Sequence, residues 1–125
     1  MSDEKTEDVT GYRLLIVEDE VLLVMDLEMF FEEQGIEVLE PARNIQSALA
    51  ALETERPDVV TLDMNLNGES SAPVAAVLKE QNIPFVIISG YTGTDAEAPD
   101  FQHAPMVKKP YDPKELLRTI TSLLS

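Results

Sequence analysis

The sequence predicts an α/β protein whose five parallel strands form one open sheet with helices on both faces. Short apolar runs alternate with longer segments of helical spacing, which is typical of strand-helix-strand units joined by right-handed crossovers. The expected strands are almost continuously apolar, as strands covered on both faces are. The chain has 125 residues, which is the size of one domain. A single open sheet therefore accounts for the whole pattern.

Turn and capping signals set the bounds of most expected elements. The expected strands are residues 13–17, 36–39, 58–62, 84–89 and 106–107, and the expected helices are residues 20–34, 44–55, a segment around 75–78 and a last helix after residue 112. Gly35 closes the first helix and Pro57 ends the second, while Asp112 is placed to cap the last. Between Gly90 and Pro105 the apolar periodicity fails, so we expect the fourth helix to be short or mobile.

Composition and charge exclude several classes of function. The 24 acidic and 9 basic side chains give a formal charge of -15, which repels phosphate backbones and anionic lipid. Neither nucleic acid nor a membrane is therefore an expected partner. The absence of Cys excludes thiolate metal sites and disulfides. Residues 1–11 are polar and acidic and are expected to be a disordered lead-in to one domain over residues 12–125. With neither a signal peptide nor a membrane span, a cytoplasmic location is expected.

Polar side chains follow the expected strands at the edge where ligands bind in such sheets. The residues at these strand ends are Glu18 and Asp19, Asp63, Ser89, and Lys109. Carboxylates that meet at one edge repel one another, which raises their pKa values or requires a cation between them. Oxygen ligands of this kind suit Mg²⁺. A hydroxyl and an ammonium beside the cation would bind the oxygens of a phosphoryl group, for which Asp63 could be the nucleophile.

Four motifs in this order and spacing resemble the receiver domain of bacterial two-component response regulators. They are VEDE at 17–20, LDMNL at 62–66, IISG at 87–90 and KKP at 108–110. The resemblance covers about residues 12 to 125. It implies the CheY-like, flavodoxin-like (βα)5 fold with strand order 2-1-3-4-5. It also implies a phosphoacceptor in a phosphorelay, which is a signalling domain rather than an enzyme and receives its phosphoryl group from a sensor histidine kinase.

The resemblance implies a magnesium site built from the acidic positions of these motifs. Asp63 is similar to the phosphoacceptor of the family. Asp19 and Asp63 are similar to the direct Mg²⁺ ligands, together with the backbone carbonyl of Asn65. Glu18 resembles the outer acidic residue that acts on the metal through water. These roles are expectations that come from the family and not from spacing alone.

The resemblance also implies residues that respond to phosphorylation. Ser89 is similar to the switch hydroxyl, and Lys109 to the Lys that pairs with the phosphoryl group, with a cis peptide bond following it. Met106 stands where receivers place a Tyr or Phe that rotates inward, so this aromatic switch is in doubt and Tyr91 is the only nearby aromatic that could replace it. Gly90 replaces the usual Ala and loosens the loop that follows.

The segment PFVIISGY at 84–91 is similar to the PFxFATGY signature of alphaproteobacterial receivers. Those proteins are often single-domain and paired with histidine kinases of the HWE or related type. The expected function is therefore a stand-alone phosphoacceptor that contacts an effector or phosphotransfer protein, or that drains a kinase of phosphate. One alternative is a magnesium-dependent phosphatase or nuclease of haloacid-dehalogenase or toprim type, which needs an acid where Asn65 stands. Another is a non-phosphorylated adaptor, which the intact Asp63, Asp19 and Lys109 argue against.

Five further side chains are expected to have ordinary structural roles. Glu20 is interpreted as a helix-start charge rather than a ligand. Lys108 is expected to be solvated, and His103 to be exposed and non-functional because it lacks metal or triad partners. Met25 and Met29 are expected to fill the core.

Overall fold

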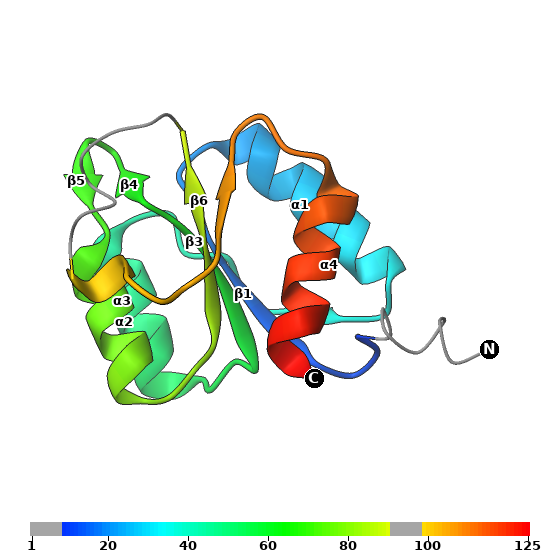
Figure 1. The fold of residues 1–125 in the computed structure, drawn as a ribbon, viewed down its shortest axis with the longest axis horizontal. Coiled ribbons are helices and arrows are strands. Elements are labelled where there is room, and N and C mark those ends of the chain that lie inside the picture. Colours follow the sequence, from blue (N-terminus) through cyan, green and yellow to red (C-terminus); the bar gives the residue numbers. More distant parts are fainter. Residues whose placement is uncertain (1–8, 91–98) are drawn as a thin grey trace.

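A computed structural model describes residues 9–90 and 99–125 and shows an open parallel sheet between two layers of helices (Figure 1). The strand order is β2-β1-β3-β6-β7. These strands are β1 (Arg13–Val17), β2 (Glu37–Val38), β3 (Val59–Asp63), β6 (Phe85–Ser89) and β7 (Met106–Lys108). The order equals the expected 2-1-3-4-5 once the separate hairpin of β4 and β5 is left out of the count. The predicted fold class is therefore confirmed.

Among the described residues, two helices cover each face of the sheet, α1 and α4 on one side and α2 and α3 on the other (Figure 1). Their bounds are α1 (Val21–Glu33), α2 (Ile45–Thr54), α3 (Ala72–Glu80) and α4 (Pro113–Leu124). The side chain of Asn44 accepts a hydrogen bond from the Ser47 N–H at 2.7 Å and caps α2, while Asp112 caps α4 through the Lys114 N–H. No helix in residues 9–90 and 99–125 is long and apolar enough to cross a membrane.

Alternate residues of the central strands pack into two separate hydrophobic layers. In β1, Leu14 and Ile16 face α1 and α4, whereas Leu15 and Val17 face α2 and α3, and none of the four is more than 1% exposed. Burying a side chain of this size stabilises the fold by roughly 1.5–3 kcal/mol. The two layers therefore fix the position of each strand end and of the polar residues that follow it.

A small hairpin, β4 (Asn65–Leu66) and β5 (Glu69–Ser70), stands between the third expected strand and the third expected helix, where the sequence predicts no further strand. Its two loop residues, Asn67 and Gly68, have φ angles of 53° and 85°. Positive φ at both positions is the geometry of a type I′ hairpin turn, for which Asn-Gly is a favoured pair. The hairpin projects from the carboxyl edge of the sheet, directly after Asp63.

Two of the predicted irregular segments lie largely outside the described residues. Val9, within the predicted lead-in of residues 1–11, is fully buried in the hydrophobic layer that α1 and α4 share, while residues 1–8 lie outside the described residues. After β6, residues 91–98 also lie outside them, so the expectation of a short or mobile fourth helix stays a prediction. The described part of that segment contains one 3-10 turn, η3 (Pro99–Phe101).

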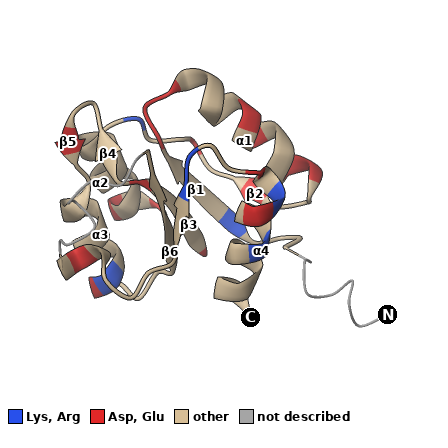
Figure 2. Ribbon diagram, turned by 45° about the horizontal axis from the view of Figure 1, so that its top comes forward, with Lys and Arg blue, Asp and Glu red and all other residues tan. Residues whose placement is uncertain are grey.

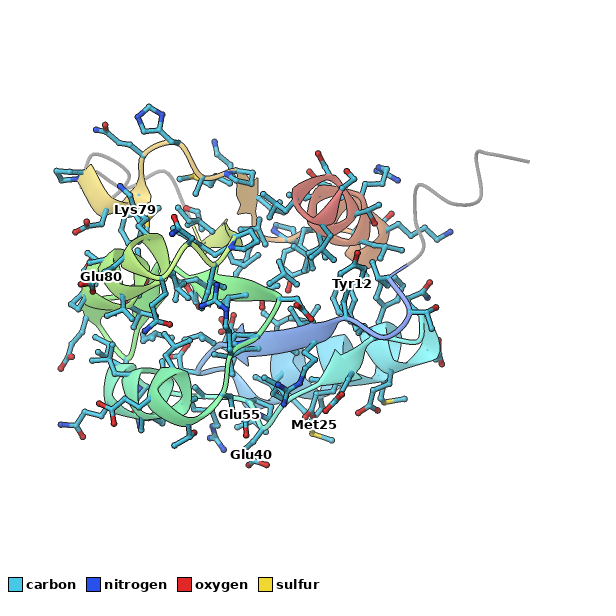
Figure 3. All side chains as sticks on the ribbon, turned by 90° about the horizontal axis from the view of Figure 1, so that it is seen from below. Tyr12, Met25, Glu40, Glu55, Lys79 and Glu80 are labelled. Atoms are coloured by element: carbon cyan, nitrogen blue, oxygen red, sulfur yellow. The ribbon has the colours of Figure 1, made fainter. Side chains whose placement is uncertain are left out.

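The prediction that Met25 and Met29 fill the core is wrong. These two side chains are 51% and 63% exposed, and Leu22 and Val21 on the same helix are 77% and 45% exposed. We call these four residues the outer face of α1, and Figure 3 shows Met25 at the periphery of the molecule. The buried residues of the helix are Val24, Leu27 and Phe31. Because α1 is apolar on both sides, its composition alone does not show which side is buried.

Candidate functional site

Three carboxylates meet at the carboxyl edge of the sheet, where β1 and β3 end side by side. Glu18 and Asp19 follow β1, and Asp63 is the last residue of β3. One carboxylate oxygen of each residue lies within 4.8 Å of the other two. Glu18 and Asp63 are only 2% and 4% exposed, and Asp19 is half-buried. The structure thus brings together the acidic residues that the sequence predicts at this edge.

The electrostatics of this cluster favour a bound cation. Burial, together with the negative charge of Asp63, raises the pKa of Glu18 from 4.5 to about 8. At neutral pH Glu18 therefore keeps a proton unless a positive charge offsets the repulsion. Carboxylate oxygens are the ligands that Mg²⁺ prefers, and it fills the rest of its shell with water. The donor set of the cluster therefore fits this ion.

Lys109 brings one positive charge into the cluster. The residue directly follows β7, and its N–H donates a hydrogen bond to the Ser89 carbonyl at 2.8 Å. Its Nζ lies 2.9 Å from Glu20, 3.0 Å from Asp63 and 3.3 Å from Glu18. Burial lowers the pKa of Lys109, but the Glu20 and Asp63 carboxylates outweigh burial and raise it. The ammonium is therefore charged beside Asp63.

Hydrogen bonds fix both the side chain and the backbone carbonyl of Asp63. Its Oδ1 accepts a bond from the Asn65 N–H at 3.1 Å, and its backbone carbonyl accepts one from the Ser71 hydroxyl at 2.6 Å. The same hydroxyl also donates to the Met64 carbonyl at 3.1 Å. Sequence reasoning missed Ser71, which is fully buried at the N-cap of α3. A Ser before a helix usually caps it, but this hydroxyl binds the backbone at the end of β3.

The β4-β5 hairpin also contacts the acidic cluster. The Asn67 N–H donates a hydrogen bond to Oδ2 of Asp19 at 3.1 Å, and the Gly68 N–H donates one to Oδ1 of Asn65 at 3.0 Å. Asp19 is thereby oriented by a backbone donor from a distant segment. The use of the Asn65 carbonyl as a metal ligand stays a prediction.

The other predicted switch residues lie around this edge or outside the described residues. Ser89 ends β6, the strand next to the one that ends in Asp63, and is 3% exposed. Gly90 follows it, and a Cβ added there meets no atom within 4 Å, so the Ala that the family places there would fit. Met106, on the edge strand β7, is 38% exposed. Tyr91 lies outside the described residues.

A second aromatic residue, Tyr111, lies close to the site, while the expectation that Tyr91 could replace the missing aromatic switch stays a prediction. Tyr111, two residues after Lys109, packs against the α1 and α4 layer. Burial and the negative charge of Glu18 raise the pKa of its hydroxyl. Within the described chain this hydroxyl is buried and makes no hydrogen bond. Tyr111 directly follows the KKP motif, and this position is the sequence signal that could have identified it.

Four smaller expectations can be compared with the structure. The Lys109–Pro110 peptide bond is cis, as predicted. Lys108 and His103 are exposed, as predicted. Glu20 does stand at the N-cap of α1, but its side chain makes no capping bond and instead pairs with Lys109. Its interpretation as a simple helix-start charge is therefore incomplete.

Comparison with known proteins agrees with this geometry. The model of the response regulator receiver domain family matches residues 14–121, so the chain belongs to that family. The transcriptional regulatory protein PdtaR of Mycobacterium tuberculosis is 28% identical over 116 residues, which are 90% of this chain and 57% of PdtaR. The crystal structure of the response regulator PhyR from Brucella abortus has a TM-score of 0.81 and 30% identity, and the match covers 98% of this chain and 51% of PhyR.

A third similar protein has been solved with a bound ligand. The response regulator TrrA from Thermotoga maritima, solved in complex with Mg²⁺ and BeF, matches with a TM-score of 0.79 and 26% identity over 90% of this chain and 99% of TrrA. The chain spans about half the length of the curated relatives it matches. The resemblance to receiver domains is confirmed, and with it a place in two-component signalling. The roles of individual site residues stay predictions.

Proposed function

We propose that this receiver domain is a phosphoacceptor, in which Asp63 takes a phosphoryl group from the phosphohistidine of a sensor histidine kinase. The observation that carries the proposal is the meeting of the Glu18, Asp19 and Asp63 carboxylates within 4.8 Å, with Lys109 Nζ 3.0 Å from Asp63. The phosphorylated domain would then signal by contact with an effector or phosphotransfer protein, or would drain its kinase of phosphate.

The proposed metal ligands are Asp19, Asp63 and the backbone carbonyl of Asn65, with Glu18 acting through water. Their oxygens suit Mg²⁺, which when bound supplies positive charge to both the carboxylates and the phosphoryl oxygens. The raised pKa of Glu18 supports this proposal, because burial and the nearby charge of Asp63 both disfavour its ionised form and a bound cation would offset them. Membership of the receiver family also favours it over the phosphatase and nuclease alternatives.

In the proposed transfer, a carboxylate oxygen of Asp63 attacks the phosphorus atom in line with the leaving group. The new O–P bond forms as the P–N bond of phosphohistidine breaks, and the imidazole keeps the electron pair and takes up one proton. Lys109 already stands at the nucleophile, where its charge would stabilise the phosphoryl oxygens. Ser89 is proposed to donate a hydrogen bond from its hydroxyl to one of these phosphoryl oxygens.

Incubation with acetyl phosphate and Mg²⁺ is expected to add one phosphoryl group to the wild-type chain and none to Asp63→Asn. The amide lacks the nucleophilic oxygen charge that the transfer requires. Intact-mass spectrometry measures the product directly. Asp58→Asn, which changes a carboxylate just before β3 at the opposite edge of the sheet, is the matched control and should be labelled like the wild type. Labelling that survives in Asp63→Asn, or an unlabelled wild type at saturating Mg²⁺, would overturn the proposal.

The proposal also includes a docking surface for the kinase, namely the outer face of α1. The first residue of this face, Val21, directly follows Glu20 of the acidic cluster. A protein that brings a phosphohistidine to Asp63 must cover the surface beside this edge. Acidic residues are common on α1 (Figure 2), and the chain as a whole has a charge of -15. An apolar surface with basic residues around it is therefore the complementary partner.

Replacing Leu22 and Met25 together by Glu is expected to weaken phosphotransfer from the cognate kinase by at least about tenfold. Each apolar side chain that docking buries would contribute roughly 1.5–3 kcal/mol to binding. Labelling by acetyl phosphate should not change, because the site itself is untouched. The assay follows transfer from each autophosphorylated host kinase. Tyr12→Glu, an exposed apolar position before β1, is the control. Equal transfer to the wild type and the double variant would show that the kinase docks elsewhere.

A further inference from the structure

All three donors of the Lys109 ammonium are engaged by carboxyl groups. The partners are Glu20 at 2.9 Å, Asp63 at 3.0 Å and Glu18 at 3.3 Å. An ammonium group has three N–H donors and no acceptor. A phosphoryl oxygen that arrives at Asp63 must therefore displace Lys109 from one of these carboxyl groups before it can bind the ammonium.

Glu20 is the carboxylate that Lys109 can release at the lowest cost. The side chains of Glu18 and Asp63 are only 3% and 6% exposed, whereas the side chain of Glu20 is 62% exposed. Water solvates a freed Glu20, but it does not reach a freed buried carboxylate to the same extent. The shortest of the three contacts is thus also the most easily exchanged.

The backbone around Glu20 supports a role for its side chain away from the helix. Glu20 occupies the N-cap of α1, where Ser, Thr, Asp and Asn are preferred because they can accept a bond from the first turn. Its side chain makes no such bond. Its N–H instead donates to Oε2 of Glu18 at 3.1 Å, which fixes the residue beside the acidic cluster. From there the carboxylate reaches Lys109.

We propose that Glu20 is a positioning residue that holds the Lys109 ammonium in the unphosphorylated domain and releases it to the phosphoryl group. The inference rests on the proposed phosphorylation of Asp63. Because Glu20 competes with the phosphoryl oxygens for one N–H of Lys109, it makes phosphorylation slower than the buried residues alone would allow. The contact therefore sets how readily the domain responds to a donor.

The test compares the wild type with Glu20→Gln and Glu20→Asp in phosphorylation by acetyl phosphate at saturating Mg²⁺. Glu20→Gln removes the charge with little change of shape and should raise the maximal rate about two- to fivefold, the range for one exposed ion pair. Glu20→Asp keeps the charge and is a better N-cap, but it is one methylene too short to keep the contact. If positioning matters, Glu20→Asp should be as fast as Glu20→Gln.

The possible outcomes are distinct. A Glu20→Gln variant that is unchanged or slower overturns the inference, as does a Glu20→Asp variant that matches the wild type. A faster variant whose gain lies only in the KM for acetyl phosphate indicates simple charge repulsion of the donor, which also overturns it. In all three cases the labelled wild type leaves the proposed function standing. An unlabelled wild type instead removes the proposed function.

The Nζ nitrogen of Lys109 offers a second measurement that does not depend on rates. Its ¹⁵N signal should differ between the wild type and Glu20→Gln before phosphorylation, since one carboxylate partner is missing. After loading with beryllofluoride and Mg²⁺, the two signals should coincide because neither protein uses Glu20 any longer. A difference that persists after loading would show that Glu20 keeps the ammonium, which contradicts the proposed release.

Discussion

Replacing Lys109 by Ala is expected to lower the free energy of unfolding of the metal-free domain by about 3 kcal/mol. The Lys109 side chain is only 17% exposed, and its ammonium compensates the nearly buried carboxylate of Asp63 and also contacts Glu18. Removing one partner of a buried charge group leaves the other charges without compensation. Urea unfolding in the presence of a chelator measures this loss, and phosphorylation of Asp63 by acetyl phosphate should also slow by about 100-fold.

Three comparisons separate this effect from a general loss of packing. Lys108→Ala removes the exposed neighbouring charge and should change neither quantity. Added Mg²⁺ should restore much of the stability of Lys109→Ala, because the ion supplies the missing positive charge. Combining Lys109→Ala with Asp63→Asn should also recover stability, since a neutral amide needs no cation. If the double variant is as unstable as the single one, electrostatics is not the cause of the loss.

The position of the site could be predicted from the sequence because topology determines it. Continuous apolar strands that alternate with helices require a parallel sheet, and all carboxyl ends of such a sheet lie at one edge. Asp19, Asp63 and Lys109 follow three of these strands, so their meeting depends on connectivity and not on details of side-chain packing. The family motifs added the order of the strands, which local patterns do not determine.

The features that the sequence did not reveal depend on tertiary contacts. The apolar run at the start of α1 fits either side of the helix, so nothing in its periodicity placed Met25 outside. Glu20 and Lys109 are 89 positions apart, and their contact depends on the directions of two flexible side chains. Ser71 looks like an ordinary cap, and only the fold shows that its hydroxyl reaches back to the Asp63 carbonyl. Sequence patterns report local structure well, but they do not identify the partner of an individual side chain.

The second large effect concerns pH and follows from Glu18, whose pKa rises from 4.5 to about 8 on folding, mainly through burial. Between these two values the folded domain holds a proton that the unfolded chain has released. The free energy of unfolding must therefore fall as pH rises through this window, and it levels off above the folded-state value. Without metal, the loss between about pH 5 and about pH 9 should be on the order of 3 kcal/mol.

Glu18→Gln isolates this contribution from that of other titrating groups. The amide stays neutral, so the variant should be close to the wild type near pH 5 and clearly more stable near pH 9, as urea unfolding at each pH can show. Mg²⁺ binds the ionised carboxylate, so its stabilising effect on the wild type should grow with pH and grow less in the variant. Glu37→Gln, at an exposed position on β2, is the matched control. A wild-type-to-variant difference that is constant with pH would mean that folding does not raise the pKa of Glu18, which would contradict the inferred effect of burial and of the Asp63 charge.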